Sequence, residues 1–202
     1  MKEALSAPQY FGEAMLKFLF LAPVAALLIA AAPPAVPPPI AGIATPPEVA
    51  ANPANRLTIE LSTGKSVVIQ LRPDLAPNHI ARIQELVRGH FYDGLIFHRV
   101  IPGFMAQGGD PTGTGEGGSP LPDLKAEFTA VPFLRGTVGA ARAQSDDSAN
   151  SQFFIMFAPE PALDGKYSVL GRVISGMDAV DGIAVGEPPL EPTKIVKATI
   201  GS

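Results

Sequence analysis

The chain has 202 residues, a net charge of -4 and 47% hydrophobic residues, which is enough for one ordinary core but hardly for two large domains. Lys and Arg are scattered without a basic run, so the sequence gives no reason to expect a nucleic acid partner. The absence of cysteine excludes disulfides, thiolate metal sites and cysteine nucleophiles.

The N-terminal part contains an uncharged run at residues 18–32, FLFLAPVAALLIAAA. This run has the length of a signal-peptide apolar region and is short for a free-standing membrane span. Translation from Met15 would begin with the basic segment MLKFLF, so we predict Met15 as the true start. Because Pro33 is a poor residue to follow a signal-peptidase cut, residues 1–32 are either a signal peptide or an uncleaved membrane anchor.

A proline- and alanine-rich segment follows at residues 33–55, PPAVPPPIAGIATPPEVAANPAN. Proline fixes φ and has no backbone N–H, so we expect an extended linker that makes neither helix nor strand. The folded domain is therefore predicted to span residues 56–202.

The folded part opens with a predicted β-hairpin at residues 56–72. Leu57, Ile59 and Leu61 alternate with polar residues, and a second β-branched run follows the turn STGK. Short apolar runs separated by Gly, Pro, Asp and Ser predict further strands at 95–101, 104–107, 136–141, 153–157, 168–174 and 194–200.

Two helices are predicted among these strands. After Pro77, apolar residues recur at helical spacing from Ile80 to Val87, and Gly89 marks the end of this amphipathic helix. A second, weaker helix is predicted at 176–184. Many short strands with two helices favour a closed β-barrel over an alternating βαβ fold.

The segment FHRVIPGFMAQGGD, residues 97–110, places one arginine in an apolar strand. Strand alternation predicts Phe97 and Arg99 on one face and His98 on the other. Arg99 would then face the surroundings of Phe104, Met105 and Gln107. Taken alone, such an arginine is more often a surface cation stacked beside an aromatic ring.

A second segment changes that interpretation. SQFFIMFAPEPALDGKYSVLGRV, residues 151–173, together with FHRVIPGFMAQGGD, resembles the cyclophilin family of peptidyl-prolyl isomerases over about residues 56–200. The resemblance implies a mainly β fold, a closed eight-stranded antiparallel barrel capped by two α-helices.

The resemblance also implies the chemistry. Prolyl rotation breaks no bond and is limited by an amide barrier of roughly 18–20 kcal/mol, so no cofactor, metal or nucleophile is needed. Arg99 is implied as the catalytic donor to the prolyl imide nitrogen, and Gln107 as the catalytic residue that holds the substrate backbone. The implied proline pocket consists of Phe104, Met105, Phe154, Leu163 and Tyr167. The implied groove for the residue before proline consists of Ala141, Arg142, Ala143 and Gln152.

These inferences lead to a prediction of the partners and of the location. The short one-domain form and Arg142 indicate a bacterial protein, either periplasmic or anchored in the inner membrane facing the periplasm. We expect a monomer that acts on proline-containing polypeptides. The alternative is a binding module or holdase with little turnover, although Arg99 favours the enzyme. Ala162 stands where eukaryotic cytosolic members carry tryptophan, which predicts weak ciclosporin binding, measurable by calorimetry.

Three other features suggest no further chemistry. The glycine-rich segment 108–118 lacks the GK[ST] of a phosphate-binding loop and is expected to be a surface loop. The spacing of His79, His90 and His98 indicates no metal site. The adjacent carboxylates at 146–147 are expected in a solvated loop.

Overall fold

The computed structural model describes residues 43–201. The predicted signal peptide or anchor at 1–32 and the start at Met15 lie outside the described residues. Within residues 43–201, no helix is long and apolar enough to cross a membrane.

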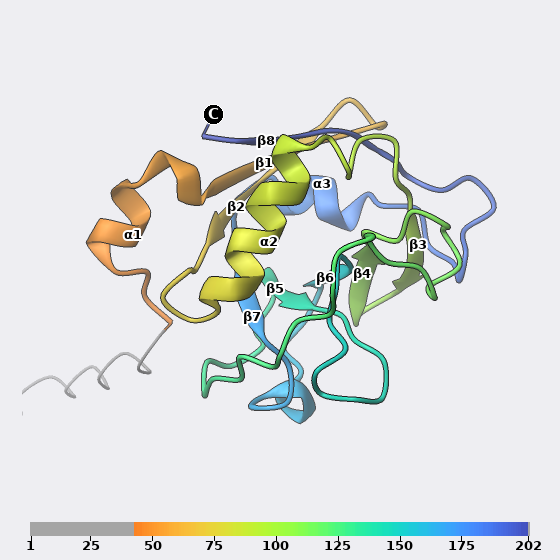
Figure 1. The fold of residues 1–202 in the computed structure, drawn as a ribbon. Coiled ribbons are helices and arrows are strands. Elements are labelled where there is room, and N and C mark those ends of the chain that lie inside the picture. The colour runs from red at the N-terminus through yellow and green to blue at the C-terminus, as the bar shows by residue number, and fades with distance from the viewer. Residues whose placement is uncertain (1–42, 202) are drawn as a thin grey trace, which may run out of the picture. The chain divides into compact units, whose positions relative to one another are not determined.

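Eight antiparallel strands form one curled sheet, in the order β3-β4-β6-β5-β7-β2-β1-β8 (Figure 1). The strands are β1 Arg56–Leu61, β2 Ser66–Leu71, β3 Phe97–Ile101, β4 Met105–Gly108, β5 Thr137–Ala140, β6 Phe153–Met156, β7 Val169–Ser175 and β8 Ile195–Ile200. Each falls at a run for which the sequence predicts a strand, and the predicted hairpin is β1 with β2. The mainly β, eight-stranded antiparallel fold is confirmed.

The two edge strands, β3 and β8, are not joined by a strand ladder in the part of the chain that the structure describes. A bridge between Ile96 and Lys194 lies just before them. It is flanked by hydrogen bonds from the Phe97 N–H to the Thr193 carbonyl (3.0 Å) and from the Ile195 N–H to the Leu95 carbonyl (2.8 Å). The described ladders therefore form an open, curled sheet, where the sequence predicts a closed barrel.

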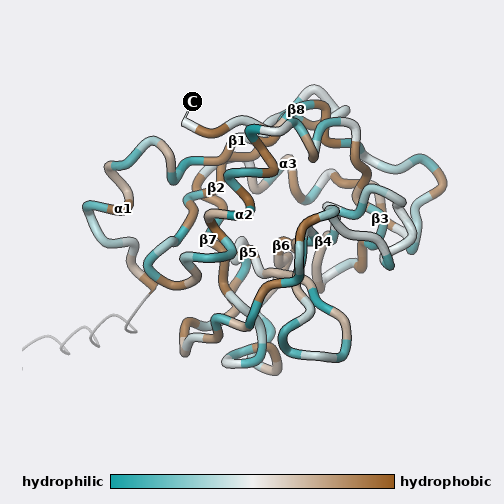
Figure 2. The backbone as a smooth tube through the Cα atoms, in the orientation of Figure 1, coloured by the Kyte–Doolittle hydropathy of each residue, from teal (hydrophilic) through white to brown (hydrophobic). Residues whose placement is uncertain are grey.

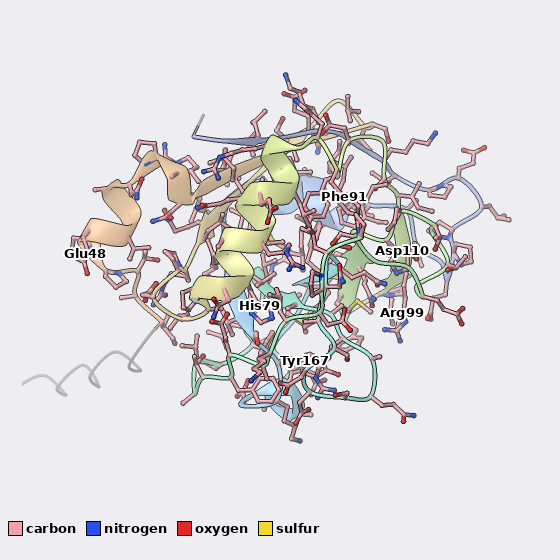
Figure 3. All side chains as sticks on the ribbon, in the orientation of Figure 1. Glu48, His79, Phe91, Arg99, Asp110 and Tyr167 are labelled. Carbon is pink, nitrogen blue, oxygen red and sulfur yellow. The ribbon has the colours of Figure 1, made fainter. Side chains whose placement is uncertain are left out.

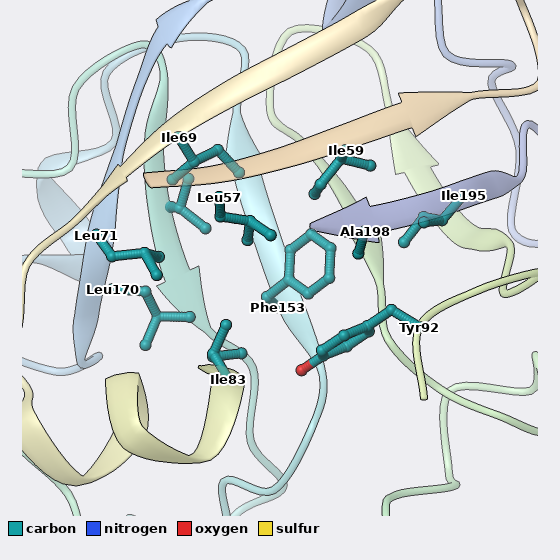
Figure 4. A pocket seen from close by; sticks show the side chains of 11 residues that line it. Leu57, Ile59, Ile69, Leu71, Ile83, Tyr92, Phe153, Leu170, Ile195 and Ala198 are labelled. Atoms are coloured by element: carbon teal, nitrogen blue, oxygen red, sulfur yellow. The ribbon is translucent and has the colours of Figure 1, made fainter. Parts of the chain in front are cut away.

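One face of the sheet packs on the helix α2 (Pro77–Arg88) to form the main core. Figure 4 shows this interior, where Leu57, Ile59 and Ile83 surround the rings of Tyr92 and Phe153. These rings meet edge to face at a centroid distance of 5.8 Å. The remaining cavity is about 20 Å³ with an entirely apolar lining, so the main core is almost filled.

Helix α2 confirms the predicted amphipathic helix and ends at the predicted Gly89. Figure 2 shows hydrophobic and hydrophilic residues alternating along it, as expected for a helix with one buried face. Its first turn has no local side-chain cap; instead the Glu127 carboxylate accepts from the N–H groups of Asn78 and His79, at 3.1 Å each. A loop distant in sequence therefore satisfies the start of the helix. The second predicted helix is the shorter α3, Met177–Asp181.

The prediction that residues 33–55 make no helix was wrong for their C-terminal part. Helix α1 spans Pro47–Ala51, and the 3₁₀ helix η1 spans Pro53–Asn55. Each has proline in its first turn, where the missing N–H costs nothing. The segment is held to the sheet because the Gln70 amide donates to the Asn55 carbonyl at 3.0 Å, and the Val49 side chain is buried.

Candidate active site

A β-bulge in β3 determines where Arg99 points. Phe97 pairs with Gly108 and Arg99 with Gln107, so three residues of β3 oppose two of β4. The extra residue is His98, and it reverses the alternation of side chains along the strand. Phe97 is consequently buried in the main core, while Arg99 lies on the outer face with its side chain 42% exposed. The prediction that Phe97 and Arg99 share a face was therefore wrong.

The outer face of the sheet carries a pocket of about 120 Å³, called the outer pocket below. Figure 3 labels two residues of this pocket, Arg99 and Tyr167. Nine residues to which the sequence assigns a site role line it: Arg99, Phe104, Met105, Gln107, Ala141, Arg142, Phe154, Leu163 and Tyr167. They come from β3, the turn between β3 and β4, β4, β6, η2 (Pro161–Leu163) and the segments that follow β5 and precede β7.

Stacked aromatic rings form the floor of the outer pocket. The rings of Phe154 and Phe133 lie nearly parallel with centroids 5.7 Å apart, and Tyr167 meets Phe154 edge to face at 5.7 Å. Phe133 is buried behind Phe154 and was not among the predicted site residues. The apolar run at 131–134 was its only signal in the sequence. These rings belong, with Met105 and Met156, to a second buried apolar cluster, separate from the main core, which lies under the pocket.

The polar groups at the mouth of the outer pocket are held in place by other side chains. Arg99 donates from Nε to the Glu187 carboxylate at 2.8 Å. Gln107 donates its amide to Gln152 Oε1, also at 2.8 Å. Gln152 in turn donates to the carbonyls of Gly115 (2.9 Å) and Gly117 (2.8 Å). Gln152 thus connects the glycine-rich loop to the pocket, a contact that the sequence did not predict.

A larger groove of about 490 Å³, the outer groove, shares Gln107, Ala141 and Arg142 with the outer pocket. Ala143 and Gln152, which the sequence also assigns to the site, line this groove but not the outer pocket. The loops at 115–119 and 148–150 supply much of the remaining lining.

Arg142 forms the wall between the two cavities. Its guanidinium lies 4.7 Å from the centre of the Tyr167 ring, in cation–π geometry. It also forms an ion pair with Asp146 at 3.0 Å and donates to the Lys166 carbonyl at 3.2 Å. These contacts fix Arg142 against Tyr167, so the wall is preorganised.

The glycine-rich loop is anchored by the buried carboxylate of Asp110. This carboxylate accepts from the N–H groups of Thr112 (2.7 Å) and Gly115 (2.6 Å) and from the Thr112 hydroxyl (2.8 Å). Burial by itself would raise the pKa of Asp110, but these bonds and one from Gly117 outweigh it and lower the pKa to about 2. Hydrogen bonds to the Asp110 carboxylate therefore hold the loop that borders the outer groove.

His98 lies beneath this loop, close to Gly115. It is buried, and neither ring nitrogen has a hydrogen-bond partner among the described residues. Burial lowers the pKa of His98, with a smaller opposing effect from Asp110. Within residues 43–201, no three His, Asp or Glu side chains are grouped as metal ligands would be.

The outer pocket is suited to binding and polarising an uncharged group. None of its lining residues is a carboxylate, a serine or a histidine, and its polar groups belong to Arg99, Gln107, Arg142 and the hydroxyl of Tyr167, beside an apolar floor. Such a set provides hydrogen-bond donors without a carboxylate or imidazole base.

Comparison with known proteins assigns the chain to a family. The sequence profile described as "Cyclophilin type peptidyl-prolyl cis-trans isomerase/CLD" matches residues 56–200. The chain belongs to the cyclophilin family. As a cyclophilin, it catalyses cis–trans isomerisation of X–Pro peptide bonds, and its substrates are proline-containing polypeptides.

Individual relatives agree with this assignment. The cyclophilin is 53% identical to a probable peptidyl-prolyl cis-trans isomerase of Brucella suis, over 75% of this chain and 85% of the relative. A cyclophilin of Hirschia baltica has a similar structure, with a TM-score of 0.68 and 31% identity over 74% of each chain. A cyclophilin-type isomerase of Cryptosporidium parvum, solved in the presence of the dipeptide Ala-Pro, has a TM-score of 0.67 and 28% identity, covering 73% of this chain and 99% of that one.

Proposed function

We propose that Arg99 accelerates prolyl rotation by donating a hydrogen bond to the imide nitrogen of a substrate held in the outer pocket. The observation that carries this proposal is a permanently charged donor at the mouth of an apolar pocket with an aromatic floor. As the X–Pro bond twists, amide resonance is lost and the nitrogen lone pair becomes localised. A donor directed at that lone pair stabilises the twisted state more than either planar isomer, which is the requirement for catalysis.

The other residues receive binding roles in this proposal. The proline ring occupies the apolar part of the outer pocket, against Phe104, Met105, Phe154, Leu163 and Tyr167. Because the Gln107 amide nitrogen already donates to Gln152, its oxygen is the group that would accept an N–H of the substrate backbone. The residue before proline would lie toward Ala141, Arg142, Ala143 and Gln152 in the outer groove. The Ala-Pro dipeptide used with the Cryptosporidium parvum relative makes an Ala-Pro peptide a suitable first substrate.

The magnitude required of Arg99 is moderate. An acceleration of about 10⁶ requires roughly 8 kcal/mol of differential stabilisation. Removing a single well-placed donor from a preorganised site typically lowers the rate by about 10² to 10³. We expect desolvation and positioning in the outer pocket to supply the remainder.

The test compares the full-length wild type with Arg99→Ala, using NMR exchange of a short Ala-Pro peptide. We expect fast cis–trans exchange with the wild type and at least a hundredfold loss in the variant, while chemical shifts of Phe154 and Tyr167 still report peptide binding. Unchanged exchange with Arg99→Ala would refute the role of Arg99.

A second candidate function, binding or holding unfolded segments with little turnover, is favoured by the size of the outer groove. At about 490 Å³ it is several times larger than the outer pocket. Suppression of aggregation of an unfolded client, measured by light scattering, distinguishes the two functions. A holdase would retain full suppression in Arg99→Ala, and its wild type would give little exchange.

We further propose three properties beyond catalysis. The bridge between Ile96 and Lys194, with its flanking hydrogen bonds, supports closure of the sheet into a barrel between β3 and β8.

The uncharged run at 18–32 supports export to the periplasm, or anchoring in the inner membrane facing it; fractionation of spheroplasts tests this. We also propose a monomer, which sedimentation tests.

A further inference from the structure

The loop between α3 and β8 is fixed against the strand that carries Arg99. Val100 and Gly186 form a backbone bridge, with hydrogen bonds of 2.8 Å from the Val100 N–H and 3.1 Å from the Gly186 N–H. The buried Thr193 hydroxyl accepts from the Ala184 N–H at 3.0 Å, which closes the base of the loop. Neither contact involves Glu187, yet together they place it directly beside Arg99.

The Glu187 carboxylate binds one particular edge of the Arg99 side chain. Its Oε2 accepts from Nε at 2.8 Å. Across the described residues, Arg99 makes no other hydrogen bond or ion pair. Glu187 thus occupies the Nε edge and leaves both terminal Nη groups for another partner.

This arrangement addresses a specific weakness of arginine as a catalyst. Its long side chain has several rotatable bonds, and that of Arg99 is 42% exposed, so it would sample many conformations without a partner. Catalysis requires the guanidinium to be aimed at one atom of the substrate. A bond at Nε restricts the torsions of the whole side chain while the donors at its tip stay available.

We propose that Glu187 is a positioning residue for Arg99, acting through the Nε hydrogen bond without touching the substrate. The inference rests on the catalytic role proposed for Arg99. Because the pair is exposed to solvent, we expect a modest effect, about two- to fivefold in kcat, the range of exposed ion pairs. The KM should not change, since the apolar floor that binds proline does not involve Glu187.

The test measures kcat and KM of the full-length protein for an Ala-Pro peptide in three variants. Glu187→Ala removes the acceptor and should lower kcat about threefold. Glu187→Gln keeps an amide oxygen that can accept from Nε and should restore kcat nearly to the wild-type value. Glu191→Ala removes the same charge from the same loop, and should leave both parameters unchanged. The NMR resonance of the Arg99 Nε–H should shift in Glu187→Ala but stay close to its wild-type position in Glu187→Gln.

Two results would overturn the inference. One is a wild-type kcat in Glu187→Ala; the other is an equal loss in Glu187→Gln and Glu187→Ala, which would assign the effect to charge instead of orientation. Arg99→Ala, measured alongside, separates this inference from the proposed function. If Arg99→Ala is inactive and Glu187→Ala is unaffected, only the positioning role fails; if Arg99→Ala keeps wild-type kcat, the proposed role of Arg99 itself fails.

Discussion

Two neighbouring residues of β6, Phe154 and Ile155, belong to two different apolar regions of the molecule. Ile155 is fully buried in the main core, where the strands, α2 and the rings of Phe153 and Tyr92 leave a cavity of only about 20 Å³. Phe154 belongs to the cluster under the outer pocket, where about 120 Å³ remains open. Successive side chains of a strand point to opposite faces of the sheet, and this alternation places Phe154 and Ile155 in different regions.

Both regions are strongly apolar. They differ in how completely side chains fill the space and in the polar groups that border it. The main core is covered by a helix and has no polar group directed into its cavity. The outer pocket is bordered by Arg99 and Gln107, each held by a partner. Among the described residues, the outer pocket is thus an apolar cavity that side chains leave open and polar groups border.

The largest effect is expected from truncating a buried side chain of the main core. Ile155→Ala should lower the free energy of unfolding by about 2–5 kcal/mol, because it creates a cavity at a fully buried position of a closely packed core. The kcat of the folded fraction should stay at the wild-type value. Chemical denaturation measures the first quantity and the peptide assay the second. A loss below about 1 kcal/mol, or a reduced kcat under conditions where the variant is fully folded, would contradict the separation of the two regions.

Lowering the pH should destabilise the fold through protonation of Asp110, whose carboxylate anchors the glycine-rich loop beside the outer groove. The folded-state pKa is about 2, below the ordinary value of 3.8, so Asp110 stabilises the fold above pH 3.8 and loses this contribution as the pH falls toward 2. Unfolding measured at pH 5 and at pH 2.5 should show a smaller difference in Asp110→Asn than in the wild type. The exposed Glu191, changed to Gln, serves as the control and should keep the wild-type difference; equal pH dependence in all three proteins would rule out Asp110 as the source.

Removing the floor of the outer pocket should affect binding. Phe154→Ala should raise the KM for an Ala-Pro peptide roughly tenfold, because the proline ring loses its main apolar contact. Phe154→Leu should raise it less, since part of the apolar surface remains. We expect kcat to change less than KM in both variants; a large loss of kcat with unchanged KM would assign Phe154 a role in the rotation itself.

The smallest effect is expected from a change behind the floor. A methyl group at Gly139 would collide with the rings of Phe154 and Phe133, so Gly139→Ala should push Phe154 into the outer pocket and raise KM about threefold. Gly182→Ala is a suitable control, because its methyl group would meet no atom closer than 3.6 Å. Identical KM values and identical Phe154 ring shifts in the two variants would show that the floor adapts.

The fold was largely predictable because its signals are local. Alternation at Leu57 and Ile59 and helical spacing from Ile80 to Val87 depend only on neighbours in the sequence, and the structure has a strand and a helix there. The bulge at His98 was missed because nothing in the residue types reveals an unpaired position, and it reversed the predicted face of Phe97 relative to Arg99. Likewise, the helix at Val49 was missed because its segment is held by Gln70, a residue of β2 that is distant in the sequence.

The residues that line the outer pocket could be named from the sequence, whereas the contacts that hold them could not. The resemblance assigned a role to each of the nine residues that line the outer pocket. It gave no sign of the partner of Arg99, because Glu187 lies 88 residues away and their contact depends on the bridge between Val100 and Gly186. Phe133 was missed for the same reason, since its stacking on Phe154 exists only in the assembled sheet.

The most direct test of the account is the rate at which bound cis and trans peptide interconvert on the saturated enzyme, measured by NMR line shapes. We expect Arg99→Ala to lower this rate at least a hundredfold with little change in the dissociation constant, and Phe154→Ala mainly to weaken binding. An unchanged on-enzyme rate in Arg99→Ala would show that the apolar pocket alone drives the rotation and would contradict the role assigned to Arg99.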